Sequence, residues 1–289
     1  YISGGTLNMT AGDDGIHASD NVVVLGGEIT ISESYEGIEG LTIDISGGNI
    51  TVTSSDDGLN AAGGNDDSGF TNPNGMGGSP DSFDSDSDAY IHISGGTMNV
   101  NASGDGIDSN GSLIVSGGET YVSGPEDGGN GTLDYGTTAE ISGGIFAAAG
   151  SSAMAQNFGS DSSQGVMLVS TGSQQAGTAV MLSDADGSQL LSWTPAKSYE
   201  CVIISCPEIT EGSSYTVTAG DDEISVTMDS LVYGTSGMGG MGGNPGSMDG
   251  RGPGGAMDGQ APNGGMGSLP PDKGGFSNGE AMDNSDSGV

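Results

Sequence analysis

The chain has 289 residues, with 39 Asp and Glu against 3 Lys and Arg, and a formal net charge of -36. Such a charge repels nucleic acid and anionic membrane surfaces, so cations are the expected partners. Glycine fills 58 positions and aromatic residues 5%, too little bulk for a conventional globular core, yet 33% hydrophobic residues exceeds what a disordered chain carries. These values favour a narrow, stacked core.

Gly-Gly pairs recur along the first half of the chain. The pairs that recur at a nearly regular spacing begin at Gly4, Gly26, Gly47, Gly95, Gly117 and Gly143. The intervals are 22, 21, 48, 22 and 26 residues, and the longest becomes about 22 once an insertion at 63–88 is removed. A repeat of this length is typical of a solenoid, in which each coil packs on its neighbours.

Apolar and polar residues alternate on both sides of each Gly-Gly pair. Around Gly47, for example, Ile43 and Ile45 precede the pair, and Ile50 and Val52 follow it. This period predicts a strand with one buried face on each side of a glycine corner, where φ is positive. Stacked in register about 4.8 Å apart, such coils form a parallel β-helix in which equivalent side chains lie in columns. We assign residues 1–160 to it.

The remaining segments differ in composition. Residues 63–88 are rich in Gly, Asp and Ser, which predicts an acidic surface loop inserted into the β-helix. Residues 161–235 contain weaker strand patterns, with hairpin turns expected at 184–187 and 219–222, and are interpreted as degenerate coils followed by a β-rich cap. Residues 236–289 form a low-complexity tail rich in Gly, Met and Pro.

Two cysteines lie in one apolar segment. Five residues at about 3.3 Å each separate Cys201 from Cys206 along a strand, well beyond the limit of about 7 Å for a disulfide. We therefore expect two buried thiols, with an intermolecular disulfide as the alternative.

Acidic residues recur at one place in each coil, in the segments GDDGIHA, SYEGIEG, SDDGLNA and GDGIDSN. In-register stacking would bring Asp14, Glu36 and Asp57 together and place Glu39 beside Asn60. In the fifth coil, the residues at the same distances from the Gly-Gly pair are Asp127 and Asn130, which would extend the two columns. The candidate metal ligands are Asp13, Asp14, Glu36, Glu39, Asp56, Asp57, Asn60, Asp105, Asp108 and Asp127.

A column of carboxylates needs a neutralising partner. Two unit charges 4.8 Å apart repel by roughly 1 kcal/mol in bulk water, and by several times that where protein excludes water. Oxygen-only ligands in a flexible turn favour calcium (Ca²⁺) over Mg²⁺ or Zn²⁺. The alternative is plain turn chemistry, which explains Asp57-Gly58 but not Glu36 or Glu39. His17 lacks a second His at a ligand spacing and is interpreted as facing solvent.

The segments ISGGTLNMTAGDDGIHA, SYEGIEG and ITVTSSDDGLNAAGGND, with the later VIIS and GSSYTVTAG, resemble a bacterial family of secreted carbohydrate-binding proteins first described in a cellulose-degrading clostridium. The likeness covers roughly residues 1–235. It implies a right-handed, calcium-binding parallel β-helix, similar in fold to family 9 pectate lyases, that binds cellulose and acidic plant polysaccharide such as polygalacturonate. The acidic insertion and the Met-Gly tail depart from the family.

A polysaccharide lyase is disfavoured, because calcium-dependent pectate lyases use Lys or Arg as the base and the first such residue here is Lys197. A glycosidase is disfavoured because carboxylates that hold a metal are not free to shuttle protons. Calcium with open coordination positions could instead join protein carboxylates to an acidic or plant cell-wall polysaccharide. Neutral sugar would need an aromatic platform, and the Tyr and Phe residues are few and scattered.

The alternative function is structural. The chain begins inside a strand at Tyr1, and an open first rung would allow head-to-tail self-association into a calcium-stabilised extracellular fibre.

No apolar run approaches the roughly 20 residues that cross a bilayer, so no membrane span is expected. A start at Tyr1 rather than Met fits a processed, secreted bacterial protein located outside the cell or on its surface. A non-catalytic binder is therefore the preferred prediction.

Overall fold

The computed structural model describes residues 1–62 and 88–234, which contain strands β1 to β19 and no helix. The expected loop at 63–88, apart from Asp88, and the expected tail at 236–289 lie outside these residues. Across the described part of the chain, nothing qualifies as an apolar helix of membrane-spanning length. The all-β class predicted from the sequence is confirmed.

Five long strands stack in parallel and carry the Gly-Gly pairs. They are β1 (Ile2–Met9), β3 (Asn21–Ile31), β5 (Thr42–Ser54), β7 (Tyr90–Ala102) and β9 (Ser112–Ser123). Each runs through its glycine pair, so the two strands expected on either side of the corner are one bent strand. The second glycine has a positive φ, between 83° and 118° in the second to fifth coils, as the sequence predicted.

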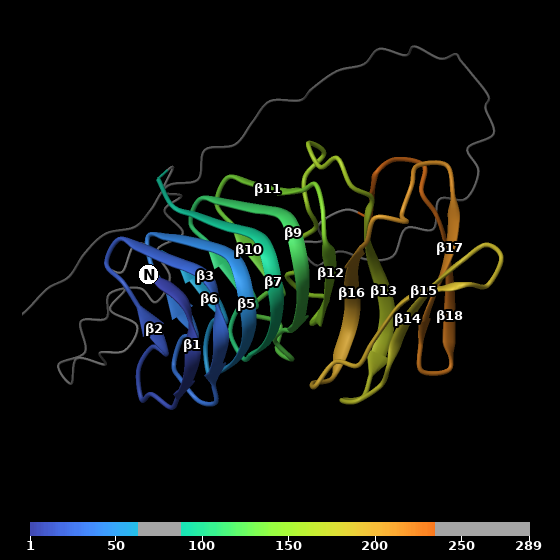
Figure 1. Ribbon diagram of the computed structural model, residues 1–289. Helices are drawn as coiled ribbons and strands as arrows, with labels where there is room; N and C mark the ends of the chain where they lie inside the picture. Colours follow the sequence, from blue (N-terminus) through green and yellow to red (C-terminus); the bar gives the residue numbers. More distant parts are fainter. Residues whose placement is uncertain (63–87, 235–289) are drawn as a thin grey trace, which may run out of the picture. The chain divides into compact units, whose positions relative to one another are not determined.

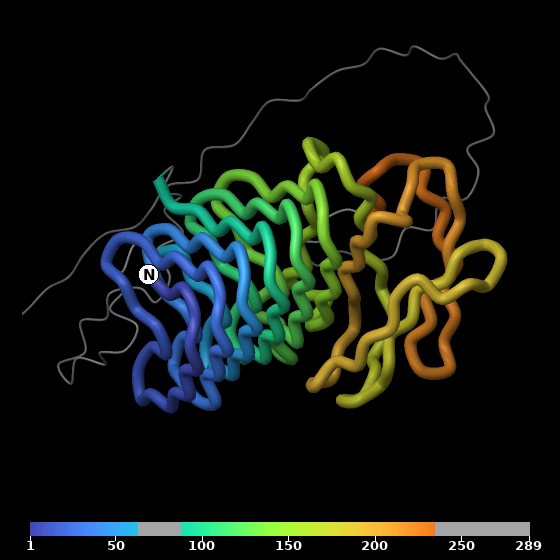
Figure 2. Tube along the Cα trace, in the orientation of Figure 1, coloured from blue at the N-terminus to red at the C-terminus, as the bar shows by residue number. Residues whose placement is uncertain are grey.

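A second parallel sheet completes each coil with a short strand. Its members are β2 (Ile16–His17), β4 (Ile38–Glu39), β6 (Leu59–Ala61), β8 (Ile107–Ser109) and β10 (Leu133–Tyr135). Ile16, Ile38, Leu59, Ile107 and Leu133 occupy equivalent positions in successive strands. Figures 1 and 2 show the resulting stack of coils, and the predicted parallel solenoid is confirmed.

The core is a narrow column between the two sheets. Ile43, Ile91 and Leu113 are aligned on successive long strands, and all three are fully buried. Burial of each such side chain stabilises the folded state by roughly 1.5–3 kcal/mol. Because the Ile, Val and Leu columns run through every coil, a chain with few aromatic residues still builds a continuous core.

The sheet of long strands changes character after the fifth coil. Strands β11 (Thr138–Ile141) and β12 (Ile145–Gly150) still pair parallel with β9. Strand β16 (Tyr199–Ser205) then pairs antiparallel with both β12 and β13 (Val166–Gln174), and β19 (Val232–Tyr233) pairs with β13. The expectation of degenerate coils after residue 161 is therefore wrong, because the chain doubles back across the sheet instead of winding on.

The rest of this region is a four-stranded antiparallel sheet. Its order is β15 (Gln189–Trp193), β14 (Val180–Asp184), β17 (Ser214–Ala219) and β18 (Asp222–Thr227). Strands β14 and β15 pair across the turn predicted at 184–187, and β17 and β18 pair across the turn predicted at 219–222. Both hairpins are confirmed.

Both cysteines are free and buried, as predicted. Burial raises the pKa of the Cys201 and Cys206 thiols to about 12 each. Neither thiol is therefore ionised near neutral pH, and each acts as a small apolar side chain.

Candidate metal centre

The short strands align polar side chains into a column. His17 pairs with Glu39, Glu39 with Asn60, Asn60 with Asp108, and Asp108 with Asp134. These five residues follow the apolar residue of each short strand by one position; that residue is half-buried in β2 and buried in the other four strands. The neighbours expected from the repeat are thus brought together from His17 to Asp108.

A second column lies three residues earlier in each coil. The amides of Gly15, Gly37 and Gly58 donate to the carbonyls of Glu36, Asp57 and Asp105, each at 2.9 Å. The residues before these glycines are therefore equivalent in successive coils. We call the two columns together the acidic ladder; its members are Asp14, His17, Glu36, Glu39, Asp57, Asn60, Asp105 and Asp108.

The glycines of this motif have a steric role that the acids lack. A Cβ on Gly37 would fall well inside 3.0 Å of the Gly58 carbonyl oxygen and of Val52 Cγ1. Close stacking of the coils therefore requires glycine at this position. The stacking of the coils does not require an acid at Glu36, so it explains the glycine but not the carboxylate.

Several ladder side chains are buried although they are polar or charged. The exposed fractions are 2% for Glu36, 1% for Glu39, 6% for Asp57 and 4% for Asn60. Asn60 Nδ2 donates to Glu36 Oε1 at 2.9 Å, which joins the two columns. Removing carboxylates from water costs several kcal/mol per ion unless a partner offsets it.

Three aspartates converge at one end of the ladder. Asp57, Asp105 and Asp108 each offer a carboxylate oxygen, and these atoms lie within 4.8 Å of one another. The backbone amide of Asp105 donates to Asp57 Oδ1 at 2.6 Å. Burial, followed by the charges of Asp105 and Asp108, raises the pKa of Asp57 well above its ordinary value. The site therefore favours a bound positive charge, either a proton or a metal ion.

A second group joins Asp14, His17 and Glu39 at the first two coils. His17 Nδ1 is hydrogen bonded to Glu39 Oε2 and lies 3.2 Å from Asp14 Oδ2. The hydrogen bond to Glu39 is the main cause that raises the pKa of His17, against the effect of partial burial. The imidazole is 43% exposed, so the prediction that it faces solvent is correct. Its contact with Glu39 was not predicted from the sequence. Its alignment above Glu39 in the repeat was the available signal.

Three predicted ligands, Asp13, Asp56 and Asp127, lie outside the acidic ladder, and Glu36 and Asn60 belong to the ladder but to neither of the two groups. Asp13 is exposed and Asp56 is half-buried, and Tyr35 lies between them in the same column. A hydrogen bond to Asp56 is the main cause that raises the pKa of Tyr35. Asp127 is exposed, and its Oδ1 accepts a hydrogen bond from the Gly129 amide at 2.9 Å within a local turn.

The fifth coil breaks the expected alignment. The Gly106 amide donates to Gly131 at 3.1 Å, so Gly131 takes the position expected for Asp127. Asp134 takes the position expected for Asn130 and accepts from Gln156 Nε2 at 2.5 Å. The 26-residue interval of this coil contains four more residues than the usual 22, and they lie before Gly131. Counting from the Gly-Gly pair therefore gave the wrong residues.

The donor set of the three aspartates fits calcium. Ca²⁺ takes roughly 6–8 oxygen ligands in flexible geometry, and three carboxylates leave positions for water or for ligand oxygens. The group around His17 fits less well, because imidazole nitrogen is not a preferred calcium ligand and a charged imidazole itself neutralises the neighbouring acids. Asp57, Asp105 and Asp108 are thus the residues that would hold the ion.

A serine, a histidine and an aspartate also lie in series across β5, β7 and β9. His92 Nε2 lies 2.9 Å from Ser116 Oγ, whereas His92 Nδ1 lies 3.6 Å from Asp44 Oδ1, beyond hydrogen-bond length. Tyr90 donates to Asp44 Oδ2 at 2.7 Å instead. Without a bond from Asp44 to orient the imidazole, this trio does not support the assignment of a nucleophile.

Fold and site together define a parallel β-solenoid with a partly buried ladder of carboxylates. Residues 1–75 match the model of a family described as "Carbohydrate-binding domain-containing protein". The matched segment includes β1 to β6 and the ladder from Asp14 to Asn60. No curated protein and no solved structure gives a match.

Proposed function

We propose that the chain is a non-catalytic carbohydrate-binding protein that binds acidic or plant cell-wall polysaccharide through calcium held on the acidic ladder. The observation that carries the proposal is the convergence of Asp57, Asp105 and Asp108 within 4.8 Å in a chain with a net charge of -36. The family match over residues 1–75 supports the carbohydrate part of the proposal.

Calcium resolves a conflict between this charge and an acidic glycan. The protein alone repels a uronate chain. When bound to the three aspartates, calcium supplies a positive charge with open coordination positions for sugar carboxylate and hydroxyl oxygens. Asp57, Asp105 and Asp108 would orient the ion, while the Asn60–Glu36 hydrogen bond fixes the neighbouring side chains. Recognition then depends on the metal and not on a basic patch.

Location outside the cell or on its surface belongs to the same proposal. Extracellular calcium is abundant enough for sites of modest affinity, and plant cell-wall polysaccharide is an extracellular ligand. Head-to-tail assembly into a fibre stays a prediction from the sequence.

Affinity electrophoresis tests the proposal. We expect polygalacturonate in a native gel to retard the protein when calcium is present, and EDTA to abolish the retardation. Asp57→Asn combined with Asp108→Asn should abolish it too. A matched pair of exposed aspartates, Asp221→Asn with Asp186→Asn, changes the net charge equally and should leave it intact. Retardation that survives chelation, or that both pairs weaken alike, would refute the calcium-dependent site.

A further inference from the structure

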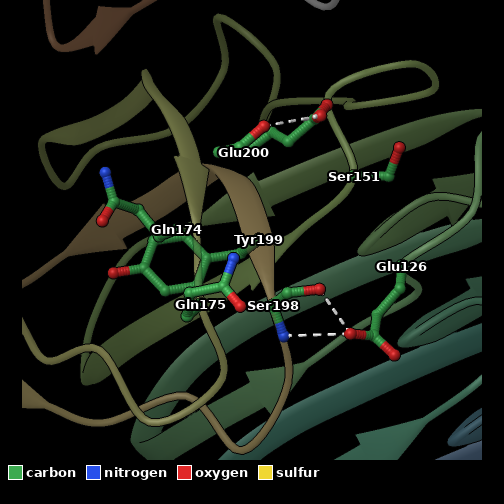
Figure 3. A pocket seen from close by; sticks show the side chains of 8 residues that line it. Glu126, Ser151, Gln174, Gln175, Ser198, Tyr199 and Glu200 are labelled. Atoms are coloured by element: carbon green, nitrogen blue, oxygen red, sulfur yellow. Dashed lines mark hydrogen bonds between the residues drawn. The ribbon is translucent and has the colours of Figure 1, made fainter.

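A polar pocket lies at one edge of the sheet, beyond the acidic ladder. Strands β9 and β12 end at this edge, and because β16 runs antiparallel between β12 and β13, β16 begins and β13 ends there. The loops that leave these strands line a pocket of about 120 Å³ (Figure 3). Its wall contains Glu126, Ser151, Gln174, Gln175, Tyr199 and Glu200, with Ser173 and Ser198.

The pocket is fixed by hydrogen bonds to its two carboxylates. Glu126 Oε1 accepts from the Ser198 amide at 3.1 Å and from the Ser198 hydroxyl, as the dashed lines of Figure 3 show. Glu200 accepts from Ser152 Oγ at 2.7 Å and from Ser173 Oγ at 3.3 Å. The geometry of the pocket is thus set before any ligand binds, which lowers the entropy lost on binding.

Both carboxylates are ionised at neutral pH. The hydrogen bond from the Ser198 hydroxyl is the main cause that lowers the pKa of Glu126, and the one from the Ser152 hydroxyl is the main cause that lowers the pKa of Glu200. Lys197, next to Ser198, directs its ammonium to the Ala102 carbonyl and to Ser103 Oγ. Two fixed negative charges disfavour a uronate in this pocket.

The remaining lining groups suit hydroxyls. Serine hydroxyls and glutamine amides both donate and accept, and a carboxylate can accept from two vicinal sugar hydroxyls. Tyr199 is 2% exposed and donates to the Thr178 carbonyl at 3.1 Å, so it is a wall and not a stacking platform. The volume is below the roughly 300–1,000 Å³ of sites that enclose drug-sized ligands, so it suits a single sugar ring.

We propose that this pocket, bounded by Glu126, Gln175 and Glu200, binds one ring of a neutral polysaccharide through its hydroxyls and without calcium. The inference rests on the proposed function in that it takes the chain to bind carbohydrate. It adds a second site, which binds sugar hydroxyls directly and without calcium. A sugar held by several hydrogen bonds in a preformed pocket needs no aromatic platform, so the scattered Tyr and Phe residues do not count against it.

Titration calorimetry of the full chain with cellohexaose and xylohexaose in excess EDTA tests the inference. We expect at least one of them to bind. Binding should be about tenfold weaker in Glu200→Gln, which replaces a charged acceptor oxygen by an NH2 donor, and in Gln175→Ala, which loses a hydrogen bond to the sugar. Gln175 is exposed, so its truncation leaves the fold intact. Gln189→Ala removes an exposed glutamine that does not line the pocket and should bind as the parent does.

Hexagalacturonate with calcium, titrated in parallel, separates the two proposals. If it binds and neither neutral oligosaccharide does, the pocket inference is wrong and the calcium site stands. If a neutral oligosaccharide binds in EDTA and hexagalacturonate fails with calcium, the reverse holds. Neutral binding that Glu200→Gln and Gln175→Ala leave unchanged would overturn the inference, since the sugar would then lie elsewhere.

Discussion

Gly37 connects the acidic ladder to the stacking of the coils. A Cβ at this position would overlap the backbone oxygen of Gly58, which cannot move without shifting the next coil. We expect Gly37→Ala to lower the free energy of unfolding by about 1–3 kcal/mol, the usual cost of overpacking. Chemical denaturation measures the difference.

Gly12→Ala is the matched control. Gly12 lies in the equivalent turn of the first coil, just before Asp13 and Asp14. A Cβ on Gly12 would meet no atom within 4 Å. We expect its effect to stay within about 0.5 kcal/mol. Equal losses in the two variants would mean that backbone entropy, and not coil contact, explains the glycines.

Individual residues were predictable only while the repeat kept its length. Asp14, Glu36, Asp57 and Asp105 recur at one distance from Gly-Gly, so simple counting placed them correctly. The fifth coil contains extra residues whose position within the coil leaves no mark in the composition, so Asp134 was missed. Burial of Glu36 and Glu39 was also beyond sequence reasoning, because it depends on how neighbouring coils close over them.

At the scale of elements, β16 is one of three strands, with β12 and β13, that contribute buried residues to both hydrophobic cores. Ile203 packs into the core of the solenoid and Ile204 into the core of the antiparallel region, and both are at most 1% exposed. Successive side chains of a strand point to opposite faces, so one strand serves both cores. We expect Ile203→Ala and Ile204→Ala each to cost about 2–5 kcal/mol of stability.

Ile114→Ala provides the comparison for β16. Ile114 lies on β9 of the same sheet but is 36% exposed, so its truncation leaves no closed cavity. Thermal and chemical unfolding of the three variants should show a small loss for Ile114→Ala and one cooperative transition for the other two. Separate transitions in Ile204→Ala would show that the antiparallel region unfolds independently of the coils.

The pairing direction of β16 illustrates what element-scale patterns leave open. The apolar runs in the segments GVMLVS and ECVIIS correctly predicted strands, observed as Val166–Gln174 and Tyr199–Ser205. The same pattern serves parallel and antiparallel pairing, and the connection between these strands contains a hairpin that the sequence did reveal. Whether a strand pairs parallel or antiparallel depends on the end from which the returning chain enters the sheet. Local periodicity does not encode this direction.

For the whole molecule, charge is the dominant property. The solenoid was predictable because a repeat near 22 residues, abundant glycine and few aromatic residues leave few other folds. The same repeat concentrates part of a net charge of -36 into one ladder, with Asp57, Asp105 and Asp108 close together. Self-repulsion of this kind destabilises a compact state unless cations offset it.

Stability of the whole chain should therefore depend jointly on pH and calcium. The folded-state pKa of Asp57 is raised, so without metal the folded state binds this proton more tightly than the unfolded chain does. The resulting stability is fully present below the unfolded pKa of about 4 and is lost as pH rises through the folded pKa. In EDTA we expect the Tm to fall across this range, and to fall less in Asp57→Asn.

Calcium should reverse that loss at high pH, because an ion that binds only the folded state stabilises it by about 2.7 kcal/mol at a concentration of 100 times Kd. Calorimetric scans at pH 8 with calcium chloride, and with sodium chloride at equal ionic strength, separate binding from screening. Sodium should raise the Tm of the parent and of Asp57→Asn alike, whereas calcium should raise the parent more. If the two salts raise the Tm equally, charge screening explains the whole effect, and the proposal that calcium binds to the acidic ladder is wrong.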